Sequence, residues 1–343
     1  MKTTTGFLNK ALALSITALA FAGPLRATLT VVDPNTSVST YYTNNTADPI
    51  VSFDRDASSN LYYMTYSGFP DTDVWKTSGG TPTNIYHNAD TYAGASVVTI
   101  GDYVYFSDNS ASTYLRGYGP LGGVPATTLL ATSSVGYYAQ ATHNGAMFLT
   151  GAPGFTTNQI YYTAIGANGS LANNPAISLG VTSGYSGPIA FDLSGNLFYA
   201  PGSGDLSIYK WSAAEIDAAI ADPIGHGLLV AGHQWADYSS RAAAVDGATA
   251  MVIDANGNPF VTLTRYGDPS FLVKFGTDTG GAYDGNNATI LTDSTRLGEL
   301  RNFDGNLYLS TENRIVEIVP EPASAALLVL SGLGLGCVRR RRV

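Results

Sequence analysis

The chain has 343 residues, of which 45% are hydrophobic and 13% are charged, with 26 acidic side chains against 17 basic ones. Seven of the basic side chains belong to Lys2, Lys10, Arg26 and the arginine cluster 339–342, so residues 28–321 carry a net charge of about −16. Such an acidic surface repels phosphate backbones, which excludes nucleic acid as an expected partner. The single cysteine, Cys337, excludes an internal disulfide.

The first 27 residues have the layout of a secretory signal peptide. Lys2 and Lys10 precede an apolar run over 11–22, and small residues follow at 20–22 and near Ala27. An apolar run of about a dozen residues is shorter than the 17 or more that a membrane-spanning helix needs. We therefore predict that residues 1–27 are a cleaved signal peptide and that the mature chain is exported. An uncleaved N-terminal anchor is the alternative.

Residues 28–319 have the character of a β protein. The chain contains 38 Gly, 22 Tyr and 13 Phe, and short aromatic and β-branched runs alternate with turn residues. A turn followed by an apolar strand recurs six times, at intervals of 43 to 62 residues. The six strands begin at Asn60, Tyr103, Ala146, Asn196, Asn258 and Asn306.

Each of these strands belongs to a larger repeat. Another short strand precedes most of them, as at 50–53, and an aromatic strand follows, as at 74–76 and 208–211, while 83–86 supplies a fourth. Four short strands in a repeat of this length make one blade of a β-propeller, and six repeats close a ring. We predict an all-β, six-bladed propeller over 28–319. Strands at this spacing also suit one or two β-sandwich domains, which are the alternative.

The ends of the repeat region predict how the ring closes. The last repeat stops after 314–319, short of a fourth strand, while 29–33 and 37–43 precede the first repeat and have no local partner. We therefore predict that the N-terminal segment completes the last blade. The runs Gly305-Asn306-Leu307-Tyr308 and Gly195-Asn196-Leu197-Phe198 resemble the blade pattern of NHL-type six-bladed propellers. These residues are expected to be scaffold.

One amphipathic helix is predicted, over 212–221. Ser212 and Glu215 have the spacing of a capping box, and Asp222-Pro223 supplies the stop. Because this segment stands between two predicted strands, we expect it to be a surface insertion.

Catalytic and zinc motifs are absent from the sequence. His87, His143, His226 and His233 are the four histidines, and none has the spacing of a zinc site. His226 and His233 flank a predicted strand over 228–231 and could face a shared site, but loop histidines are more often plain hydrogen-bonding residues. There is no nucleophile elbow and no phosphate-binding loop. We therefore predict no catalytic residue and no metal site.

Three aspartate-rich turns have the alternating oxygen ligands that calcium prefers. They occupy one repeated position, between the first two strands of a blade, and lack the distal glutamate of an EF-hand. We therefore predict Asx turns and no cofactor, with calcium as the open alternative. The three turns are 54–56, 192–196 and 254–258.

The tail, 320–343, combines three parts in a fixed order. A Pro-Glu-Pro tripeptide comes first, an apolar segment over 325–338 is expected to form a helix, and a basic cluster follows. A C-terminal apolar stretch followed by arginines is a membrane-directed signal whose basic end stays in the cytoplasm. The residues that carry the signal are Pro320, Glu321 and Pro322 in the tripeptide and Arg339, Arg340, Arg341 and Arg342 in the basic cluster.

This tail resembles the PEP-CTERM protein-sorting signal, which implies that exosortase, a membrane transpeptidase-like enzyme, recognises it. The resemblance covers 319–343 only. A helix over 323–338 would span roughly 24 Å, shorter than the hydrocarbon core of about 30 Å, which suits transient anchoring in the inner membrane. The resemblance implies delivery to the cell surface or the extracellular matrix of a Gram-negative bacterium that makes exopolysaccharide. An ordinary C-terminal transmembrane anchor is the alternative.

Two functions are compatible with this sequence. In the first, the body is a non-catalytic propeller that binds carbohydrate or another surface protein through its loops, because aromatic faces stack on sugars. In the second, it is a secreted hydrolase or lyase that acts on polysaccharide or a lactone through Asp, Glu or His in the central channel. Asp and His converging there from different blades would favour the enzyme, and an empty, uncharged channel would favour binding. We expect the first function.

Overall fold

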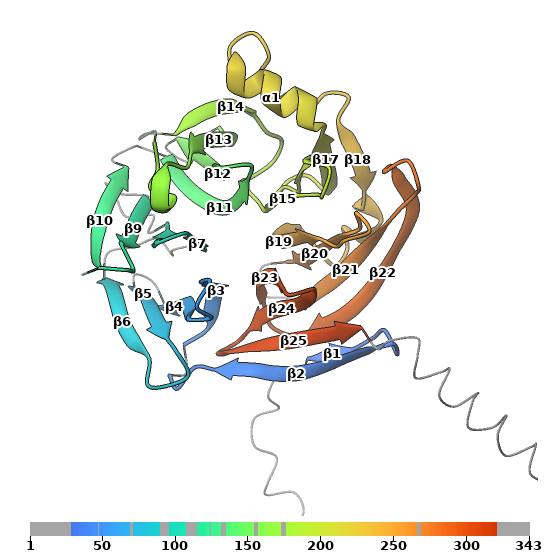
Figure 1. Cartoon of the computed structure of the whole chain (residues 1–343). Helices are drawn as coiled ribbons and strands as arrows, with labels where there is room; N and C mark the ends of the chain where they lie inside the picture. Colours follow the sequence, from blue (N-terminus) through green and yellow to red (C-terminus); the bar gives the residue numbers. More distant parts are fainter. Residues whose placement is uncertain are drawn as a thin grey trace, which may run out of the picture.

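The computed structural model describes residues 29–320 apart from 47, 69–70, 90–95, 108–114, 124, 132–134, 154–156, 173–175 and 266–268. Within these ranges the strands form six separate antiparallel sheets, which stand around a central axis as the blades of a propeller (Figure 1). The predicted six-bladed, all-β architecture is confirmed, and the β-sandwich alternative is wrong.

The first three blades each run from an inner strand to an outer one in chain order. Blade 1 contains β3 (Ile50–Arg55), β4 (Leu61–Gly68), β5 (Asp71–Thr77) and β6 (Thr83–Asn88). Blade 2 contains β7 (Val97–Ile100), β8 (Tyr103–Phe106), β9 (Leu115–Gly119) and β10 (Ala126–Ala131). Blade 3 contains β11 (Val135–His143), β12 (Ala146–Pro153), β13 (Gln159–Ala164) and β14 (Ile177–Val181).

The last three blades follow the same order, with additions from the N-terminal segment. Blade 4 contains β15 (Ile189–Phe191), β16 (Leu197–Tyr199), β17 (Ser207–Trp211) and β18 (Gln234–Asp237). Blade 5 contains β19 (Gly247–Ile253), β20 (Pro259–Thr264), β21 (Ser270–Thr277) and β22 (Tyr283–Asp293), with β1 (Thr30–Val31) at its outer edge. Blade 6 contains β23 (Leu297–Phe303), β24 (Asn306–Thr311), β25 (Arg314–Pro320) and β2 (Thr36–Thr43).

The hydrophobic core lies between the blades. Buried side chains form six clusters, and each cluster combines residues of two neighbouring blades. The six predicted repeats mark the second strand of each blade, which packs on both faces. In β4, for example, Tyr62, Tyr63 and Met64 are all fully buried although they are consecutive. The apolar runs that revealed the repeat are therefore packing surfaces.

The ring closes through its N-terminal segment, as predicted. β2 is antiparallel to β25, with Thr43 opposite Arg314 and Ser37 opposite Val319, and it supplies the fourth strand of blade 6. The segment 29–33 behaves differently from the prediction, because β1 pairs with β22 in blade 5. β22 is the longest strand of the ring and leaves its outer edge open for this short addition.

The predicted helix is confirmed as α1 (Ala213–Ala221), which lies outside the ring between β17 and β18 in sequence (Figure 1). Both halves of the capping box form, since Glu215 N–H donates to Ser212 Oγ and Ser212 N–H donates to a Glu215 carboxylate oxygen. Ile216 and Ala219 are buried against the core of blades 3 and 4.

The strand predicted over 228–231 does not form. Residues 222–233 are a loop that packs along β14, and Leu228 N–H donates to Leu179 O at 2.7 Å. The approach is close, because a Cβ atom at Gly180 would lie 2.1 Å from Leu228 O. Turns at 223–225 and 231–232 stand on either side of this contact.

The two predicted targeting segments fall outside the described residues. This applies to the signal peptide 1–27 and to the tail beyond Pro320, which includes Glu321, Pro322 and the four arginines. Pro320 itself is the last residue of β25, opposite Thr36 in β2. Among the residues that the structure describes, no helix has both the length and the apolar character needed to cross a membrane.

Candidate functional site

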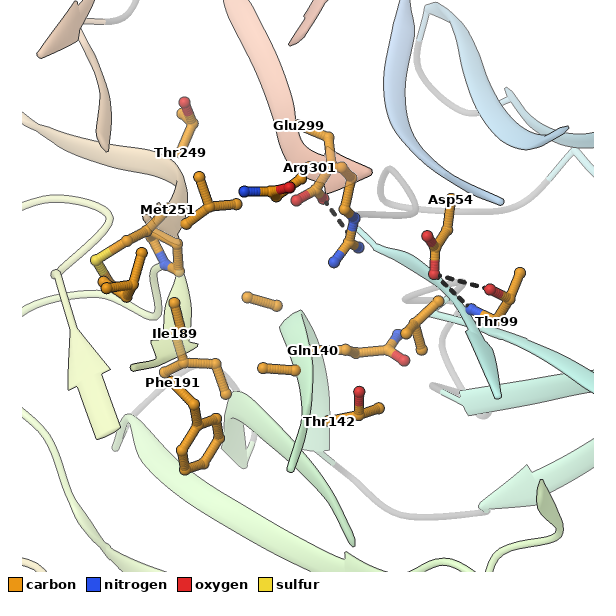
Figure 2. Close-up of a pocket in the computed structure, with 18 of the residues that line it drawn as sticks. Asp54, Thr99, Gln140, Thr142, Ile189, Phe191, Thr249, Met251, Glu299 and Arg301 are labelled. Carbon is orange, nitrogen blue, oxygen red and sulfur yellow. Dashed lines mark hydrogen bonds and ion pairs between the residues drawn. The ribbon is translucent and has the colours of Figure 1, made fainter. Parts of the chain in front are cut away.

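The central channel is the candidate site. The innermost strand of every blade, namely β3, β7, β11, β15, β19 and β23, contributes side chains to one cavity of about 310 Å³ (Figure 2). Its volume is at the lower end of the range of small-molecule sites.

The lining of this cavity is polar on one side and apolar on the other. Figure 2 shows Asp54 and Thr99 on one side, with the amide of Gln140 near Thr99, and Ile189 and Met251 facing them from the other side. Residues two positions apart on a strand point to the same face, which is why β23 presents both Glu299 and Arg301 and β11 presents both Gln140 and Thr142. The remaining polar contributions are Tyr138, Thr249 and Asn302.

Arg301 joins three blades. From β23 in blade 6, its Nε donates to Phe53 O in blade 1 at 3.1 Å, and its Nη2 donates to Val97 O in blade 2 at 2.7 Å. Nη2 also lies 3.7 Å from Glu299 Oε2. The Arg301 side chain is only 16% exposed, so these charge-assisted bonds are shielded from water.

The channel carboxylates extend the same network. Glu299 Oε2 accepts from Ser52 Oγ at 3.0 Å, and Ser52 Oγ in turn accepts from Val97 N–H at 2.9 Å. Asp54 Oδ2 accepts from the main-chain N–H of Thr99 at 2.7 Å and from its hydroxyl at 3.1 Å. Both carboxylates thus link inner strands of blades 6, 1 and 2. We call these bonds, together with those of Arg301, the closure network.

Burial raises the pKa of Glu299 above its ordinary value, since desolvation disfavours the charged carboxylate. Arg301 and the Ser52 hydroxyl oppose this shift, because both stabilise the ionised form.

Gln140 leaves one polar atom without a partner. Its Nε2 donates to Ser96 O at 3.4 Å, but its Oε1 is buried and accepts no hydrogen bond from any residue that the structure describes. The residue is 4% exposed and lines the cavity (Figure 2). An unpaired buried acceptor is costly, so this position favours an added donor.

From the sequence we expected that Asp and His converging in the channel would favour an enzyme, and that an empty, uncharged channel would favour binding. The channel meets neither criterion in full. Carboxylates do converge from different blades, at Asp54 and Glu299, so the channel is not uncharged. However, no histidine lines the cavity among the described residues, and both carboxylates accept hydrogen bonds from neighbouring strands. A general acid or base needs free access to its substrate, which these bonds restrict.

The histidines on the α1 loop lie elsewhere. His226 Nδ1 is 3.4 Å from Asp222 Oδ2, and both side chains are more than half exposed. His233 Nε2 is 2.8 Å from Glu215 Oε1, on the outside of the ring. Hydrogen bonding from Ser212 and then from His233 lowers the pKa of Glu215 to about 2. The shared site considered from the sequence is therefore not formed.

His143 has a packing role. Its ring stacks on Phe191 with a centroid distance of 4.4 Å and an interplanar angle of 9°, between blades 3 and 4.

The aspartate-rich turns at 192–196 and 254–258 form the predicted Asx turns. At 54–56 only Asp56 does so, because Asp54 belongs to β3 and accepts from Thr99. Asp254 Oδ1 accepts from the main-chain N–H of Asn256 at 2.9 Å and of Asn258 at 2.8 Å, while Asn258 Nδ2 donates to Oδ2 at 3.0 Å. Asp192 and Asp56 repeat this pattern in blades 4 and 1. These carboxylates already accept several hydrogen bonds from their own turn.

Nearby lysines further oppose calcium at two of these turns. Lys274 Nζ lies 3.7 Å from Asp254 Oδ2, and Lys210 Nζ lies 3.8 Å from Asp192 Oδ2. An ammonium group beside a carboxylate repels an incoming cation.

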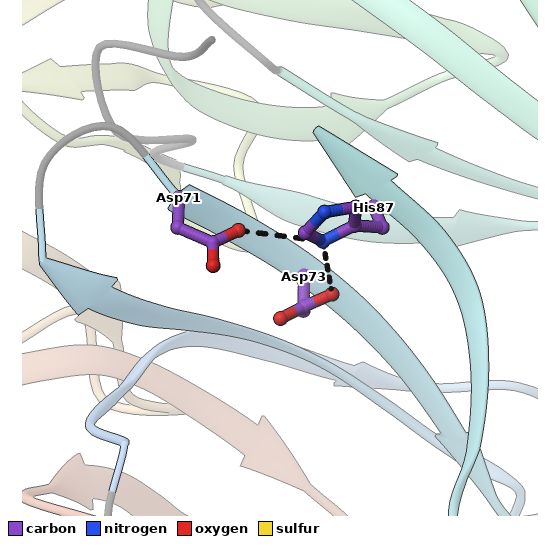
Figure 3. Close-up of side chains that lie close together, drawn as sticks. All are labelled: Asp71, Asp73 and His87. Carbon is purple, nitrogen blue, oxygen red and sulfur yellow. Dashed lines mark hydrogen bonds and ion pairs between the residues drawn. The ribbon is translucent and has the colours of Figure 1, made fainter. Parts of the chain in front are cut away.

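A separate group of possible metal ligands lies on the outer part of blade 1. Asp71 and Asp73 point to one face of β5, and the sheet register places His87 opposite Asp73 (Figure 3). His87 Nδ1 lies 3.3 Å from Asp71 Oδ1 and 3.0 Å from Asp73 Oδ1, and the three ligand atoms lie within 4.8 Å of one another. Because the set contains an imidazole, it suits a metal such as zinc better than it suits calcium, which prefers oxygen ligands. The same distances also suit a plain ion pair.

From the sequence alone, we did not identify the polar residues that line the channel as candidates for function. A first strand was recognised there for most of the blades, but the polar residues of these inner strands, such as Ser52, Glu299 and Arg301, carry no motif. A polar residue every second position in an otherwise apolar inner strand was the available signal.

Comparisons with known proteins identify the fold. No family model matches the chain, and no curated protein matches it in sequence. A family AA12 carbohydrate-active enzyme from Trichoderma reesei is 11% identical with a TM-score of 0.55, covering 85% of this chain and 97% of that one. The PQQ-bound aldose sugar dehydrogenase from Streptomyces coelicolor is 14% identical with a TM-score of 0.53, covering 82% and 98%. The calcium-binding protein regucalcin from Agrobacterium tumefaciens is 14% identical with a TM-score of 0.52, covering 81% and 93%. At these identities the likeness concerns the fold alone.

Proposed function

We propose that this chain is an exported, non-catalytic binding propeller, which its tail delivers to the cell surface or the extracellular matrix, where it binds carbohydrate or another surface protein. The observation that carries the non-catalytic part is the closure network. Asp54, Glu299 and Arg301 are the charged groups of the cavity lining, and all three hold the inner strands of blades 6, 1 and 2 together. Charged groups engaged in this way stabilise the ring.

Tyr185 is a candidate contact for a carbohydrate that binds at the rim of the propeller. This side chain is 65% exposed, whereas most of the large aromatic side chains are packed between blades. An exposed tyrosine offers a flat apolar face for a sugar ring and a hydroxyl for its polar edge. Leu193 is 85% exposed and offers apolar area without an aromatic face.

A glycan array tests the binding function. The purified exported protein is applied in calcium and again in EDTA, and the host exopolysaccharide is included among the probes. We expect a defined subset of glycans to bind, with weaker signals for Tyr185→Ala and unchanged signals for Leu193→Ala. Absence of binding to every glycan and to the cell-surface fraction would overturn the binding proposal.

Sorting by exosortase is the second part of the proposal, and its support is the order of parts in the tail. Intact-mass spectrometry of the exported protein, from cells with and without exosortase, tests it. We expect a shortened C-terminus only in cells that contain exosortase. In those cells, replacing Glu321 with Ala is expected to abolish this shortening. A chain that ends at Val343 in both strains contradicts sorting.

Calcium binding is a weaker candidate, favoured only by the acidic groups on the outer part of blade 1. A titration of the protein with calcium and with zinc distinguishes the possibilities, with Asp73→Asn as the variant. Because the set contains an imidazole, we expect any binding there to favour zinc.

A hydrolase or lyase remains the alternative function, and the raised pKa of Glu299 is the observation that favours it. Release of reducing or unsaturated ends from the exopolysaccharide, which is lost in Glu299→Gln while the fold is retained, would replace the non-catalytic proposal with this one.

A further inference from the structure

Gln140 lines the channel, and its buried amide oxygen is an unused hydrogen-bond acceptor. The residue is 4% exposed, and its Oε1 has no donor among the described residues. Figure 2 shows the side chain extending from β11 into the group of cavity residues, on the side of Asp54 and Thr99. A buried acceptor without a donor lowers stability, and a bound molecule that donates a hydrogen bond would remove that penalty.

The groups around Gln140 complement a molecule that both donates and accepts. The bonds to Phe53 O and Val97 O use two of the five N–H groups of the Arg301 guanidinium, which leaves donors for a ligand. Glu299 accepts from Ser52 with Oε2, so its other oxygen can accept from a ligand hydroxyl. A compound with several hydroxyl groups meets all three requirements together.

The opposite wall limits the class further. Ile189 and Met251 present apolar surface to the same cavity. A pyranose ring has hydroxyl groups around its edge and C–H groups on its faces, so it matches one polar and one apolar wall. With a volume of about 310 Å³, the cavity is at the small end of ligand sites, which suits one sugar ring better than a chain segment.

The charges in the cavity select among sugars. Asp54 and Glu299 supply two carboxylates against the single guanidinium of Arg301. This excess of negative charge disfavours a uronate, whose carboxylate would be buried beside like charges.

We infer that the channel holds one neutral monosaccharide unit, with Gln140 Oε1 accepting from one of its hydroxyl groups and Arg301 and Glu299 contacting its polar edge. This inference rests on the proposed binding function and assigns it a second contact, inside the ring and separate from the rim at Tyr185. The sugar is either free or the terminal unit of a glycan.

Saturation-transfer difference NMR on the full exported protein tests this site. The probes are glucose, galactose, N-acetylglucosamine and glucuronate, each at millimolar concentration. We expect transfer to at least one neutral sugar and none to glucuronate. A trisaccharide that ends in the bound sugar separates the two sources, because transfer confined to its terminal ring indicates a chain end.

Gln140→Met is the decisive variant, since it preserves side-chain length and removes the acceptor. We expect affinity for the neutral sugar to fall by about threefold to tenfold, the effect of one hydrogen bond, while the thermal midpoint stays the same or rises. Gln159→Leu is the matched control in the same blade, because the Gln159 amide oxygen already accepts from Ser178. Its affinity is expected to equal that of the wild type.

The outcomes separate this inference from the proposed function. If no neutral sugar gives saturation transfer, or if Gln140→Met binds as tightly as the wild type, the channel site is wrong. Glycan-array binding that depends on Tyr185 would then still support a rim-binding propeller. Conversely, channel binding of a free sugar with no binding to any glycan or surface protein would support the inference and overturn the broader proposal.

Discussion

Replacing Arg301 with methionine is expected to destabilise the whole ring. Methionine preserves much of the apolar stem but removes the donors to Phe53 O and Val97 O and the positive charge beside Glu299. Hydrogen bonds from a charged donor contribute about 1.5 to 3 kcal/mol each, so two of them predict a loss of about 3 to 6 kcal/mol in the free energy of unfolding. Loss of the counter-charge for the buried Glu299 acts in the same direction.

Thermal unfolding followed by circular dichroism measures this effect. For a domain of this size, with an unfolding entropy of about 0.6 kcal/mol/K, the loss corresponds to a decrease of roughly 5 to 10 °C in the unfolding midpoint. Arg265→Met is a matched control, because Arg265 also donates to two main-chain carbonyls, those of Ala242 and Ala243, but within one part of the chain. We expect a smaller decrease there, because its side chain is 32% exposed.

The reasoning would be refuted if Arg301→Met unfolded at the same temperature as Arg265→Met. Should Arg301→Met fail to fold, Arg301→Lys provides the test, since it retains the charge beside Glu299 but cannot make both carbonyl bonds in the same geometry. The unfolding midpoint of Arg301→Lys is expected to lie below those of the wild type and Arg265→Met, but above the growth temperature. A wild-type midpoint for the lysine variant would contradict the role of the two carbonyl bonds.

Three further predictions concern strand β2, the Asx turns and α1. Val38→Asp should lower the free energy of unfolding by about 2 to 4 kcal/mol in a denaturant titration, because Val38 packs against the core of blades 5 and 6, while the same change at an exposed position of β2 should have little effect. Asp254→Ala should cost about 1 to 2 kcal/mol equally in calcium and in EDTA; a penalty seen only in calcium would contradict the Asx-turn assignment. Hydrogen bonding from Ser212 and then His233 lowers the pKa of Glu215 from 4.5 to about 2, so the stabilisation of α1 is fully present above 4.5 and is lost as the pH falls towards 2. Hydrogen exchange of the helix amides should show this loss in the wild type and not in Glu215→Gln.

The local elements could be predicted because their signals are local. The capping box of Ser212 and Glu215 involves residues three positions apart, and the helix begins and ends where that motif and Asp222-Pro223 indicate. The Asx turns likewise depend on bonds within five consecutive residues, as at 254–258. Local chemistry of this kind needs no knowledge of the ring.

The prediction of a strand over 228–231 was wrong because it relied on the apolar character of this run alone. The run Leu228-Leu229-Val230-Ala231 is apolar, which favours a strand, but 222–233 lies along β14 as a loop. Leu228 is buried and serves the core of blades 3 and 4, whereas Leu229 is 64% exposed. Apolar character alone does not distinguish a strand from a loop that packs one side chain into a core.

By itself, the sequence determined the number of blades, the closing strand, the helix and the acidic, disulfide-free character of the body. It did so because each blade repeats the same alternation of turns and apolar strands, and because packing between blades requires that repeat. Only the tertiary structure decided what lies in the channel. Phe53, Val97 and Arg301 are separated by up to 248 positions, and no local pattern relates them. Ring closure brings their strands together, and it leaves the buried amide oxygen of Gln140, at the wall of the cavity, without a donor among the described residues.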